Sequence, residues 1–297
     1  MFWQTTRFRL DLSRPRVMGI VNLTPDSFSD GGRHASVSLA LRHCERLVRE
    51  GADILDLGAE STRPGSPPVP LEEERARLMP VLREALRLGV AVSVDTYKAE
   101  VMREALALGA DIINDIWALR QPGATDVVAA HDACGVCLMH MHGEPRTMQA
   151  APMDGDPVGA VRQFLQAASA SLVARGVARQ RIAWDPGIGF GKTPPQNFAL
   201  LAGQGALRQA GHPLLVGWSR KSSLGIVTDL PVGERLVPSV AAAVLALERG
   251  AQVLRVHDVR ETVAALRVWQ ASVDPSLARS PQAAPGASDG TGQGLAR

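Results

Sequence analysis

Gly51-Ala52-Asp53-Ile54-Leu55 and Gly109-Ala110-Asp111-Ile112-Ile113 are two copies of one phrase, and Gly250-Ala251-Gln252-Val253-Leu254 is a third. Each copy follows a stretch with helical periodicity, and its Gly stands where a residue in the left-handed conformation ends a helix. The short aliphatic run that comes next is typical of a buried parallel strand. The repeated unit is therefore a helix, a tight turn and a strand.

Eight short apolar runs along the chain have the character of such strands. They are Val17–Val21, Ile54–Leu57, Val90–Val94, Ile112–Ile113, Val136–Met139, Ile182–Trp184, Leu214–Val216 and Val253–Val256. Amphipathic stretches such as Ser36–Glu50 and Leu71–Leu88 lie between them. Eight βα units in about 250 residues predict an α/β fold, a single-domain (β/α)8 TIM barrel, with a doubly wound open sheet as the alternative.

Two segments flank the predicted barrel, which spans residues 17–273. Phe8, Leu10 and Leu12 alternate within the N-terminal extension 1–16, and this pattern predicts a small hairpin that closes the barrel floor. The C-terminal segment 274–297 is rich in Pro, Ala, Gly and Ser from residue 280 to residue 293 and has no large apolar residue there. Such a segment cannot bury enough surface to offset its ordering entropy, so we expect a disordered tail.

Composition narrows the class of protein. The chain has 297 residues, 45% of them hydrophobic and 21% charged, which is enough apolar material for one large core. Its 32 basic and 30 acidic residues give a net charge of +2, so electrostatics favours neither a nucleic acid nor an anionic membrane as partner. We see no signal peptide, no apolar run of about 18 residues and no disulfide framework among three Cys. A cytoplasmic setting is expected.

Polar residues follow each of the eight predicted strands. They are Asn22, Asp56, Glu60, Asp95, Asn114, Asp115, His140, Asp185, Ser219, Arg220, Lys221, Arg255, His257 and Asp258. The active sites of TIM barrels form at the C-terminal ends of the strands, where these residues would meet. The sequence therefore predicts an active site in the barrel mouth.

The stretch from Asp185 to Thr193 looks like a phosphate-binding loop but has the wrong spacing. A Walker A loop has four residues between its first Gly and Gly-Lys-Thr, and only three separate Gly187 from Gly191. Its glycines are more consistent with a backbone that approaches a flat ligand closely. A purely structural turn remains the alternative.

His131, Cys134, Cys137 and His140 are spaced by three residues, which invites a zinc interpretation. Cys137 and His140 fall in a predicted strand, so Cys134 and His140 would be about 20 Å apart if the chain were extended. Zinc ligands must converge within about 2.3 Å of the ion. We therefore interpret these residues as buried or loop side chains.

Two groups in the predicted mouth have complementary chemistry. Arg63, Lys221, Arg255 and His257, together with Asn22, are typical of a diphosphate site with a hard metal ion, although a surface salt-bridge set would have the same spacing. Asp95, Asn114 and Asp185 could read the donors and acceptors of a nitrogen heterocycle. Internal salt bridging is the alternative for this second group.

The sequence resembles the dihydropteroate synthase family over residues 17 to 270. The resemblance rests on long blocks in the right order, namely Gly19-Ile-Val-Asn22-Leu-Thr-Pro-Asp-Ser-Phe28-Ser-Asp-Gly-Gly, Asp56-Leu-Gly-Ala-Glu-Ser-Thr62-Arg63-Pro-Gly, Val94-Asp95, Asn114-Asp115, Met139-His-Met-His-Gly-Glu-Pro-Arg-Thr-Met-Gln149, Asp185-Pro-Gly-Ile-Gly-Phe190-Gly-Lys192, Ser219-Arg-Lys221-Ser and Arg255-Val-His257-Asp. Ala59 departs from the Gly or Pro usual in the family.

The resemblance implies a (β/α)8 enzyme that joins (7,8-dihydropterin-6-yl)methyl diphosphate to 4-aminobenzoate and releases diphosphate. It implies three catalytic residues, namely Asp95, Lys221 and Arg255. It implies that Asp95, Asn114, Asp185 and Lys221 hold the pterin beside Met139, with Phe190 packed on the ligands. It implies that Arg63, Arg255 and His257 hold the diphosphate, that Asn22 binds Mg²⁺, and that Thr62, Pro64 and Ser219 shape the aminobenzoate pocket. It implies a loop around Asp26 and Phe28 that closes this pocket.

The resemblance also implies a homodimer. Two alternatives from other classes are a pterin-binding methyltransferase domain and a non-catalytic pterin-binding paralogue. A methyltransferase domain would have no need of the Arg63 loop or of the Ser219–Ser222 motif, and a paralogue would have lost some of the charged residues. Both features are intact, which favours the synthase.

Overall fold

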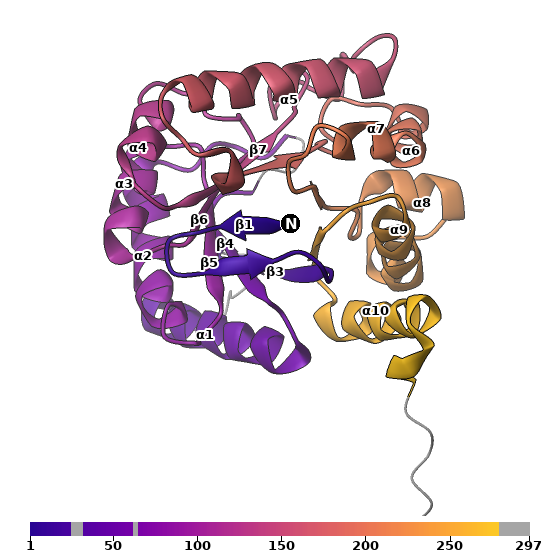
Figure 1. Ribbon diagram of the computed structural model, residues 1–297. Coiled ribbons are helices and arrows are strands. Elements are labelled where there is room, and N and C mark those ends of the chain that lie inside the picture. Colours follow the sequence, from indigo (N-terminus) through magenta and orange to yellow (C-terminus); the bar gives the residue numbers. More distant parts are fainter. Residues whose placement is uncertain (25–31, 62–64, 279–297) are drawn as a thin grey trace, which may run out of the picture.

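The chain forms a barrel of eight parallel strands surrounded by helices (Figure 1). The computed structural model describes residues 1–24, 32–61 and 65–278, and of residues 32–35 only the backbone. The barrel strands are β3 (Arg16–Asn22), β4 (Ile54–Gly58), β5 (Ala91–Asp95), β6 (Ile112–Asp115), β7 (Gly135–Met139), β8 (Ile182–Asp185), β9 (Leu215–Val216) and β10 (Val253–Val256). The helices are α1 (Gly32–Glu50), α2 (Leu71–Ala85), α3 (Ala99–Leu108), α4 (Ala124–Ala130), α5 (Pro157–Ala174), α6 (Pro194–Ala202), α7 (Gln204–Arg208), α8 (Ser222–Thr228), α9 (Leu236–Glu248) and α10 (Val259–Val273), with short 3₁₀ turns η2 (Arg179–Arg181), η3 (Val232–Glu234) and η4 (Pro275–Leu277).

The ring of strands closes between β8 and β9. Strands β3 to β8 pair in sequence order, and β10 pairs with both β3 and β9. The seam from β9 to β8 consists of a bridge between Leu214 and Trp184 and a hydrogen bond of 2.8 Å from the Trp184 amide to the Pro213 carbonyl. The predicted (β/α)8 TIM barrel is confirmed, and the alternative of an open sheet is wrong.

The repeated phrase owes its residues to the turn between helix and strand. Gly51, Gly109 and Gly250 all have φ between 101° and 104°, in the region that favours glycine. The side chain of the polar residue two positions later accepts a hydrogen bond from a backbone N–H of a neighbouring strand or of the residue directly before that strand. Asp53 accepts from Val17 at 3.0 Å, Asp111 from Val92 at 2.8 Å and Gln252 from Leu214 at 2.8 Å. Each phrase therefore ends a helix and fastens the base of the barrel.

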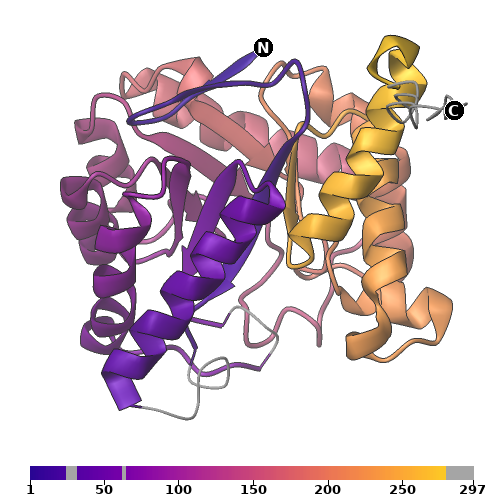
Figure 2. The ribbon, with the colours of Figure 1, turned by 90° about the horizontal axis from the view of Figure 1, so that it is seen from below.

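A hairpin covers the end of the barrel where the strands begin. It consists of β1 (Phe2–Gln4) and β2 (Arg9–Asp11), which pair antiparallel and lie in front of the barrel in Figure 1 and at one end of it in Figure 2. Its buried side chains Trp3, Leu10 and Leu12 form a cluster with the first inward-facing residues of the strands. These are Met18, Ile54, Ala91, Ile112, Cys137, Ala183, Leu215 and Val253. The barrel floor is thus apolar and closed.

Because side chains alternate along a strand with a period of two, the next inward-facing residues lie one layer above this floor, and several of them are polar. Asp56, Asn114, Asp185 and Arg255 each lie two residues after a member of the apolar floor, so they point into the same interior. Asp95 lies two layers above the floor residue of β5. The barrel interior therefore has an apolar layer at its floor and polar side chains above it, toward the mouth.

The C-terminal boundary differs from the expected one. Residues 274–278, assigned above to the tail, carry η4, and Asp274 accepts hydrogen bonds from the Ser276 amide and hydroxyl at 3.1 and 2.6 Å. The local hydrogen bonds of Asp274 explain this turn, which composition alone does not indicate. Residues 279–297 lie outside the described part of the chain.

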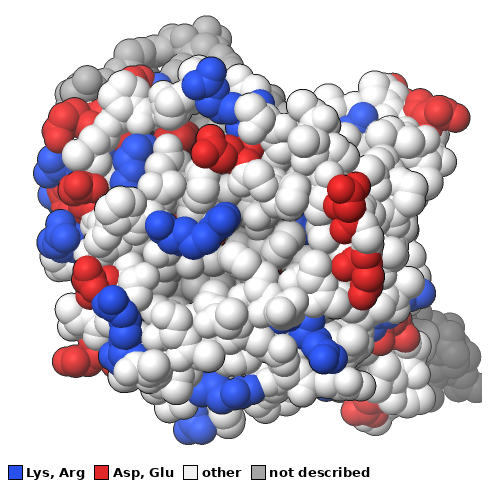
Figure 3. Space-filling view, turned by 90° about the horizontal axis from the view of Figure 1, so that it is seen from above, with Lys and Arg blue, Asp and Glu red and all other residues white. Residues whose placement is uncertain are grey.

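The outer surface carries mixed charge. On the face over α5, Figure 3 shows positive and negative side chains of the described residues interspersed around a largely uncharged centre. Arg162 is the one charged residue within α5 itself. Among the residues that the structure describes, no helix is both long enough and apolar enough to cross a membrane.

Candidate active site

Four polar side chains meet inside the barrel above the floor, two of them buried (Asp56 and Asn114) and two partly exposed (Asp95 and Arg255). The Arg255 guanidinium donates from Nε to Asp56 Oδ2 at 2.6 Å and from Nη2 to Asp95 Oδ2 at 2.8 Å. Asn114 Nδ2 donates to the same Asp56 oxygen at 3.2 Å. The other oxygen, Asp56 Oδ1, is buried and has no hydrogen-bond partner among the described residues. Asp56, Asp95, Asn114 and Arg255 are hereafter called the interior cluster.

Burial and ion pairing have opposite effects on the pKa values of the interior cluster. It raises the pKa of the Asp95 carboxyl to about 7; the Arg255 charge opposes this rise, and the Asp56 charge adds to it. The two carboxylates outweigh burial at Arg255 and raise the pKa of its guanidinium above the usual range. One fixed cation is therefore shared by two carboxylates, which leaves acceptor capacity in the barrel interior.

A second group lies on the neighbouring strand ends. Asp185 Oδ1 accepts a hydrogen bond of 2.7 Å from the Gly187 amide, while burial raises the pKa of its carboxyl. Lys221, directly before α8, has its Nζ 4.4 Å from the centroid of the Phe190 ring, within reach of a cation–π interaction. Burial lowers the pKa of this ammonium to about 8, and the Asp185 charge opposes the shift. Met139 and Phe190 belong to one apolar cluster at this side of the mouth.

The glycine-rich loop is built around its own lysine. Lys192 Nζ donates to the carbonyls of His140, Gly187 and Phe190 at 3.2, 2.8 and 3.0 Å. Gly187 has φ of 66°, and a Cβ there would overlap the His140 carbonyl oxygen. The helix α6 begins only after this loop, with Thr193 and Gln196 forming a capping box. The loop therefore brings the backbone close to the mouth and uses its lysine internally.

His257 is held by the neighbouring loop. Its Nδ1 lies 2.9 Å from Ser219 Oγ, and its backbone N–H donates to the same oxygen at 3.2 Å. Burial, together with the charges of Arg220 and Arg255, lowers the pKa of the imidazole to about 3, so the ring is neutral. Arg220 forms an ion pair with Asp258 at 2.6 Å, which joins the same two segments a second time.

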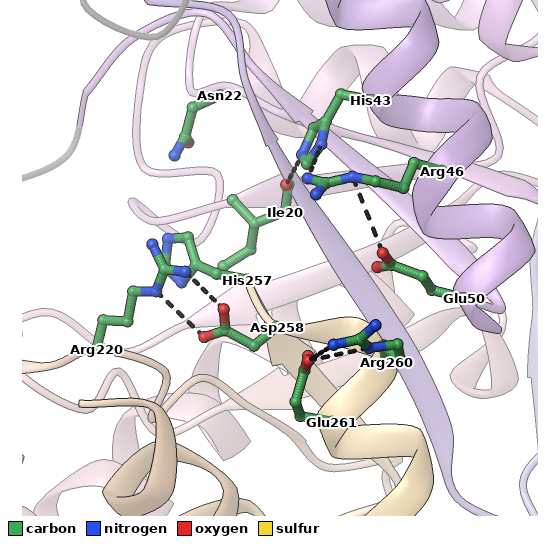
Figure 4. A pocket seen from close by; sticks show the side chains of 10 residues that line it. All are labelled: Ile20, Asn22, His43, Arg46, Glu50, Arg220, His257, Asp258, Arg260 and Glu261. Atoms are coloured by element: carbon green, nitrogen blue, oxygen red, sulfur yellow. Dashed lines mark hydrogen bonds and ion pairs between the residues drawn. The ribbon is translucent and has the colours of Figure 1, made fainter. Parts of the chain in front are cut away.

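A polar cavity of about 570 Å³ opens beside His257 (Figure 4). Asn22, His257 and Arg220 line one part of it, and ion pairs from α1 and α10 line the rest. The further lining residues are Ile20, His43, Arg46, Glu50, Asp258, Arg260 and Glu261. Cationic, amide and carboxylate groups thus face this cavity, and no residue of the interior cluster lines it.

The residues that follow β4 are fastened to those that follow β5. Glu60 accepts a hydrogen bond from the Tyr97 hydroxyl at 2.8 Å and forms an ion pair with Lys98. Lys98 also pairs with the buried Glu74 of α2. This network fixes Glu60, two residues before Thr62 and three before Arg63, both expected to contact the substrates.

The structure places most of the predicted site residues around one mouth, but not all of them. Asp95, Asn114, Met139, Asp185, Phe190, Ser219, Lys221, Arg255, His257 and Asn22 are described. Asp26, Phe28, Thr62, Arg63 and Pro64 lie outside the described residues. Arg255, expected beside the diphosphate, is bonded to Asp56 and to Asp95, and Asp95 was expected beside the pterin. Ser219, expected beside aminobenzoate, is bonded to His257.

Asp56 is the residue that the sequence interpretation passed over. The sequence predicts Asp56 as a polar strand end and gives it no functional role. Its position two residues after the apolar Ile54 was a usable signal, since Arg255 stands in the same relation to Val253. Opposite charges at equivalent interior positions of two strands are a signal for an ion pair, here between Asp56 and Arg255.

Comparison with known proteins identifies relatives of the whole barrel. The sequence pattern of a family described as "Pterin binding enzyme" matches residues 18–257. The dihydropteroate synthase of Neisseria meningitidis serogroup B is 51% identical over 275 residues, which cover 91% of this chain and 96% of that protein. The dihydropteroate synthase of Escherichia coli K12 is 48% identical over 265 residues, or 89% of this chain and 94% of that one.

Solved structures share both the fold and the sequence. Burkholderia cenocepacia dihydropteroate synthase complexed with 7,8-dihydropteroate superimposes with a TM-score of 0.85 at 51% identity, covering 94% of this chain and 98% of that one. Xanthomonas albilineans dihydropteroate synthase with 4-aminobenzoic acid gives a TM-score of 0.86 at 48% identity, covering 92% and 99%. The likeness thus extends over nearly the whole length of each relative.

Proposed function

The chain belongs to the dihydropteroate synthases of the pterin-binding enzyme family, and we propose in detail how its barrel mouth performs their reaction. The reaction joins (7,8-dihydropterin-6-yl)methyl diphosphate to the amine of 4-aminobenzoate, giving 7,8-dihydropteroate and diphosphate. The observation that supports the proposal most directly is the interior cluster with Asp185 and Lys221 beside it.

The pterin ring is recognised by the interior of the barrel. Asp185, Asn114 and Asp95 offer oxygens to the ring N–H and amino groups, and Lys221 donates to a ring acceptor. The unpartnered Asp56 Oδ1 offers a further acceptor within the same interior. Each buried donor or acceptor without a hydrogen-bond partner costs about 1–3 kcal/mol of desolvation free energy. A buried heterocycle whose donors all meet acceptors avoids this cost. Met139 and Phe190 pack on the faces of the flat ligand.

The leaving group is stabilised on the cavity side. As the C–O bond between the pterin methylene and the diphosphate breaks, the electron pair leaves with the diphosphate, and His257, Arg255 and Arg63 offset the growing charge. Preorganised donors of this kind can supply several kcal/mol. The Asp95 carboxylate favours the positive charge that develops on the pterin-methyl group. The aminobenzoate amine then attacks the methylene carbon and loses one proton, so no protein nucleophile is needed.

We propose Mg²⁺ as the cofactor, held through Asn22. The residues fit such an ion, because Mg²⁺ usually takes only one or two protein oxygens and completes its shell with water and substrate phosphate. Asn22 contributes one amide oxygen to a cavity that is roomy enough for hydrated phosphate groups. When bound, the ion would neutralise diphosphate charge. Recognition of the pterin and the rest of the stabilisation of the leaving group are assigned to the side chains described above.

The aminobenzoate pocket is proposed at the rim. Phe190 and Lys221 border it from the described side, and Thr62, Pro64, Asp26 and Phe28 are proposed to complete it. Ser219, two residues before Lys221 and hydrogen-bonded to His257, is proposed to belong to the same rim. This arrangement would bring the amine above the pterin methylene.

We further propose a homodimer in the cytoplasm. Apolar side chains are exposed on α8 and α9, which lie side by side in Figure 1, and on η3, which lies between them in sequence. They are Ile226, Val227, Val232, Leu236, Val237 and Leu245, a set typical of a protein interface. The three buried cysteines are all free, which supports a reducing compartment.

The experiment that tests the function measures diphosphate release from the pterin substrate with and without 4-aminobenzoate. We expect release coupled to dihydropteroate formation, and its loss in Asp185→Asn, with Asp132→Asn as a control at an exposed carboxylate on the floor side. Pterin binding without any release would indicate a non-catalytic paralogue. Methyl transfer from a pterin would indicate a methyltransferase domain.

A further inference from the structure

Among the described residues, the single hydroxyl proton of Ser219 has one acceptor within hydrogen-bond distance, His257 Nδ1. The backbone N–H of His257 can only donate, so Ser219 Oγ accepts that bond at 3.2 Å. The second partner of the same oxygen is His257 Nδ1 at 2.9 Å. If Nδ1 carried a proton, two donors would point at Oγ, and the hydroxyl proton would need another acceptor. Among the described residues there is none within reach.

We propose that Ser219 is a positioning residue that fixes His257 as the tautomer with its proton on Nε2, a neutral donor to the diphosphate. The Ser219 hydroxyl donates to the Nδ1 lone pair, and the imidazole proton is therefore on Nε2. No described residue bonds Nε2, and His257 lines the polar cavity together with Asn22 (Figure 4). The role of the donor rests on the proposed function, whereas the tautomer does not.

The tautomer matters because the ligand is an anion. With the proton on Nε2, the ring presents an N–H to a phosphate oxygen; with the proton on Nδ1, it would present a lone pair and repel the same oxygen. The ring stays neutral among the cations Arg220, Arg255 and Lys221, opposed by Asp258. A neutral donor fixed before the charge develops needs no reorganisation during the reaction.

The surrounding bonds keep Ser219 in place. Arg220, the next residue, has φ of 59°, in the left-handed region that a long side chain rarely adopts. Its amide donates to Ser239 Oγ of α9 at 2.9 Å, and its guanidinium pairs with Asp258, the residue after His257. The strained position is thus held from both sides, and it turns the Ser219 hydroxyl toward β10.

The test measures the tautomer directly, by ¹⁵N NMR of the histidine rings in the free enzyme. The chain has seven His, and the His257→Gln variant assigns the signal. We expect wild-type His257 to carry its proton on Nε2, and Ser219→Thr, which keeps the hydroxyl, to give the same spectrum. In Ser219→Ala we expect a population with the proton on Nδ1 and about a tenfold higher KM for the diphosphate substrate, with unchanged affinity for a pterin that lacks diphosphate.

Ser239→Ala is the matched control, because it removes the other hydroxyl that holds this loop without touching the ring. We expect its His257 tautomer to be that of the wild type. A wild-type His257 protonated on Nδ1, or on both nitrogens, would overturn the proposal whether or not Ser219→Ala folds. So would a Ser219→Ala enzyme with an unaltered tautomer and KM. Since the spectrum requires no turnover, an inactive enzyme would count against the proposed function and not against the tautomer.

Discussion

Arg255 and Asp56 are 199 residues apart in sequence and lie 2.6 Å apart across the barrel, from guanidinium Nε to carboxylate Oδ2. Their strands, β10 and β4, are not neighbours, since β3 separates them. The bond therefore spans the interior rather than the sheet. It joins the last strand of the chain to the part of the mouth where Asp95 and Asn114 lie.

Replacing Asp56 should change the titration of Asp95. The Asp56 charge helps to raise the pKa of the Asp95 carboxyl, so Asp56→Asn should lower that pKa from about 7. At a given pH near neutrality, a larger fraction of Asp95 would then be ionised. Carboxyl ¹³C NMR of the free enzyme over pH 4–9 checks the shift. Asp53→Asn, which breaks the ion pair with Arg16 at the other end of the same strand, is the control and should leave Asp95 unchanged.

Lys221 should impose an upper pH limit on pterin binding. Its pKa is lowered to about 8, so the ammonium loses its proton as the pH rises through that value, and the hydrogen bond proposed above between Lys221 and the pterin should weaken. Calorimetry with a pterin that lacks diphosphate should show affinity falling above pH 8. In Lys221→Arg the side chain stays protonated, and the fall should disappear. An identical fall in both enzymes would assign the pH limit to another group, such as Lys192.

Asn22 should affect the leaving group and spare the pterin. Asn22→Ala, or chelation of Mg²⁺, should reduce turnover because less of the diphosphate charge is neutralised. Binding of a diphosphate-free pterin should survive both treatments, since Asn22 lines the polar cavity and not the interior cluster. An equal loss of pterin affinity would show that Asn22 supports the barrel mouth instead.

Sequence periodicity predicts most of this architecture because the signals are local. Helix, glycine and buried strand recur in order, and the apolar floor and the polar ends follow from the strand period of two. The partners of the polar residues are not local. Asp56, Ser219 and Arg255 each find a partner on another strand end or loop, and the side-chain geometry that selects this partner has no signature in a single segment. The resemblance implied which residues gather at the mouth, but not that Arg255 neutralises two carboxylates or that Ser219 contacts His257.

The chain beyond Ala278 should be dispensable. Residues 279–297 contain a single large apolar residue, Leu295, too little to dock the segment on a barrel, whereas Asp274 and η4 are part of the described fold. An enzyme ending at Ala278 should keep its melting temperature and activity. Leu266→Ala, a buried position of α10, is a positive control that should lose about 2–5 kcal/mol. A drop of several degrees on truncation would show that the removed segment contacts the barrel.

Trp3 should matter for stability and not for chemistry. Its side chain is fully buried on the floor, and its Nε1 donates to the Arg181 carbonyl at 2.9 Å. Trp3→Ala should cost about 3–5 kcal/mol of unfolding free energy, as for other buried aromatic truncations. Phe2→Ala, the exposed neighbour in the same strand, should cost far less. Ligand affinities of the folded variants should match the wild type, and a change in pterin affinity would contradict this separation.

The closed floor also determines the order in which the two substrates can bind. Among the described residues, Trp3, Leu10 and Leu12 seal the end where the strands begin, so we expect ligands to reach the interior cluster from the rim, where Phe190 and Lys221 lie. A molecule seated at the rim blocks the passage of one seated below it. The pterin substrate must then enter before aminobenzoate, and steady-state kinetics should follow a compulsory sequence rather than a random one. An aminobenzoate analogue bound at the rim of the free enzyme would block entry of the pterin substrate into the barrel interior. It would therefore inhibit the enzyme in this way as well as by competition with aminobenzoate.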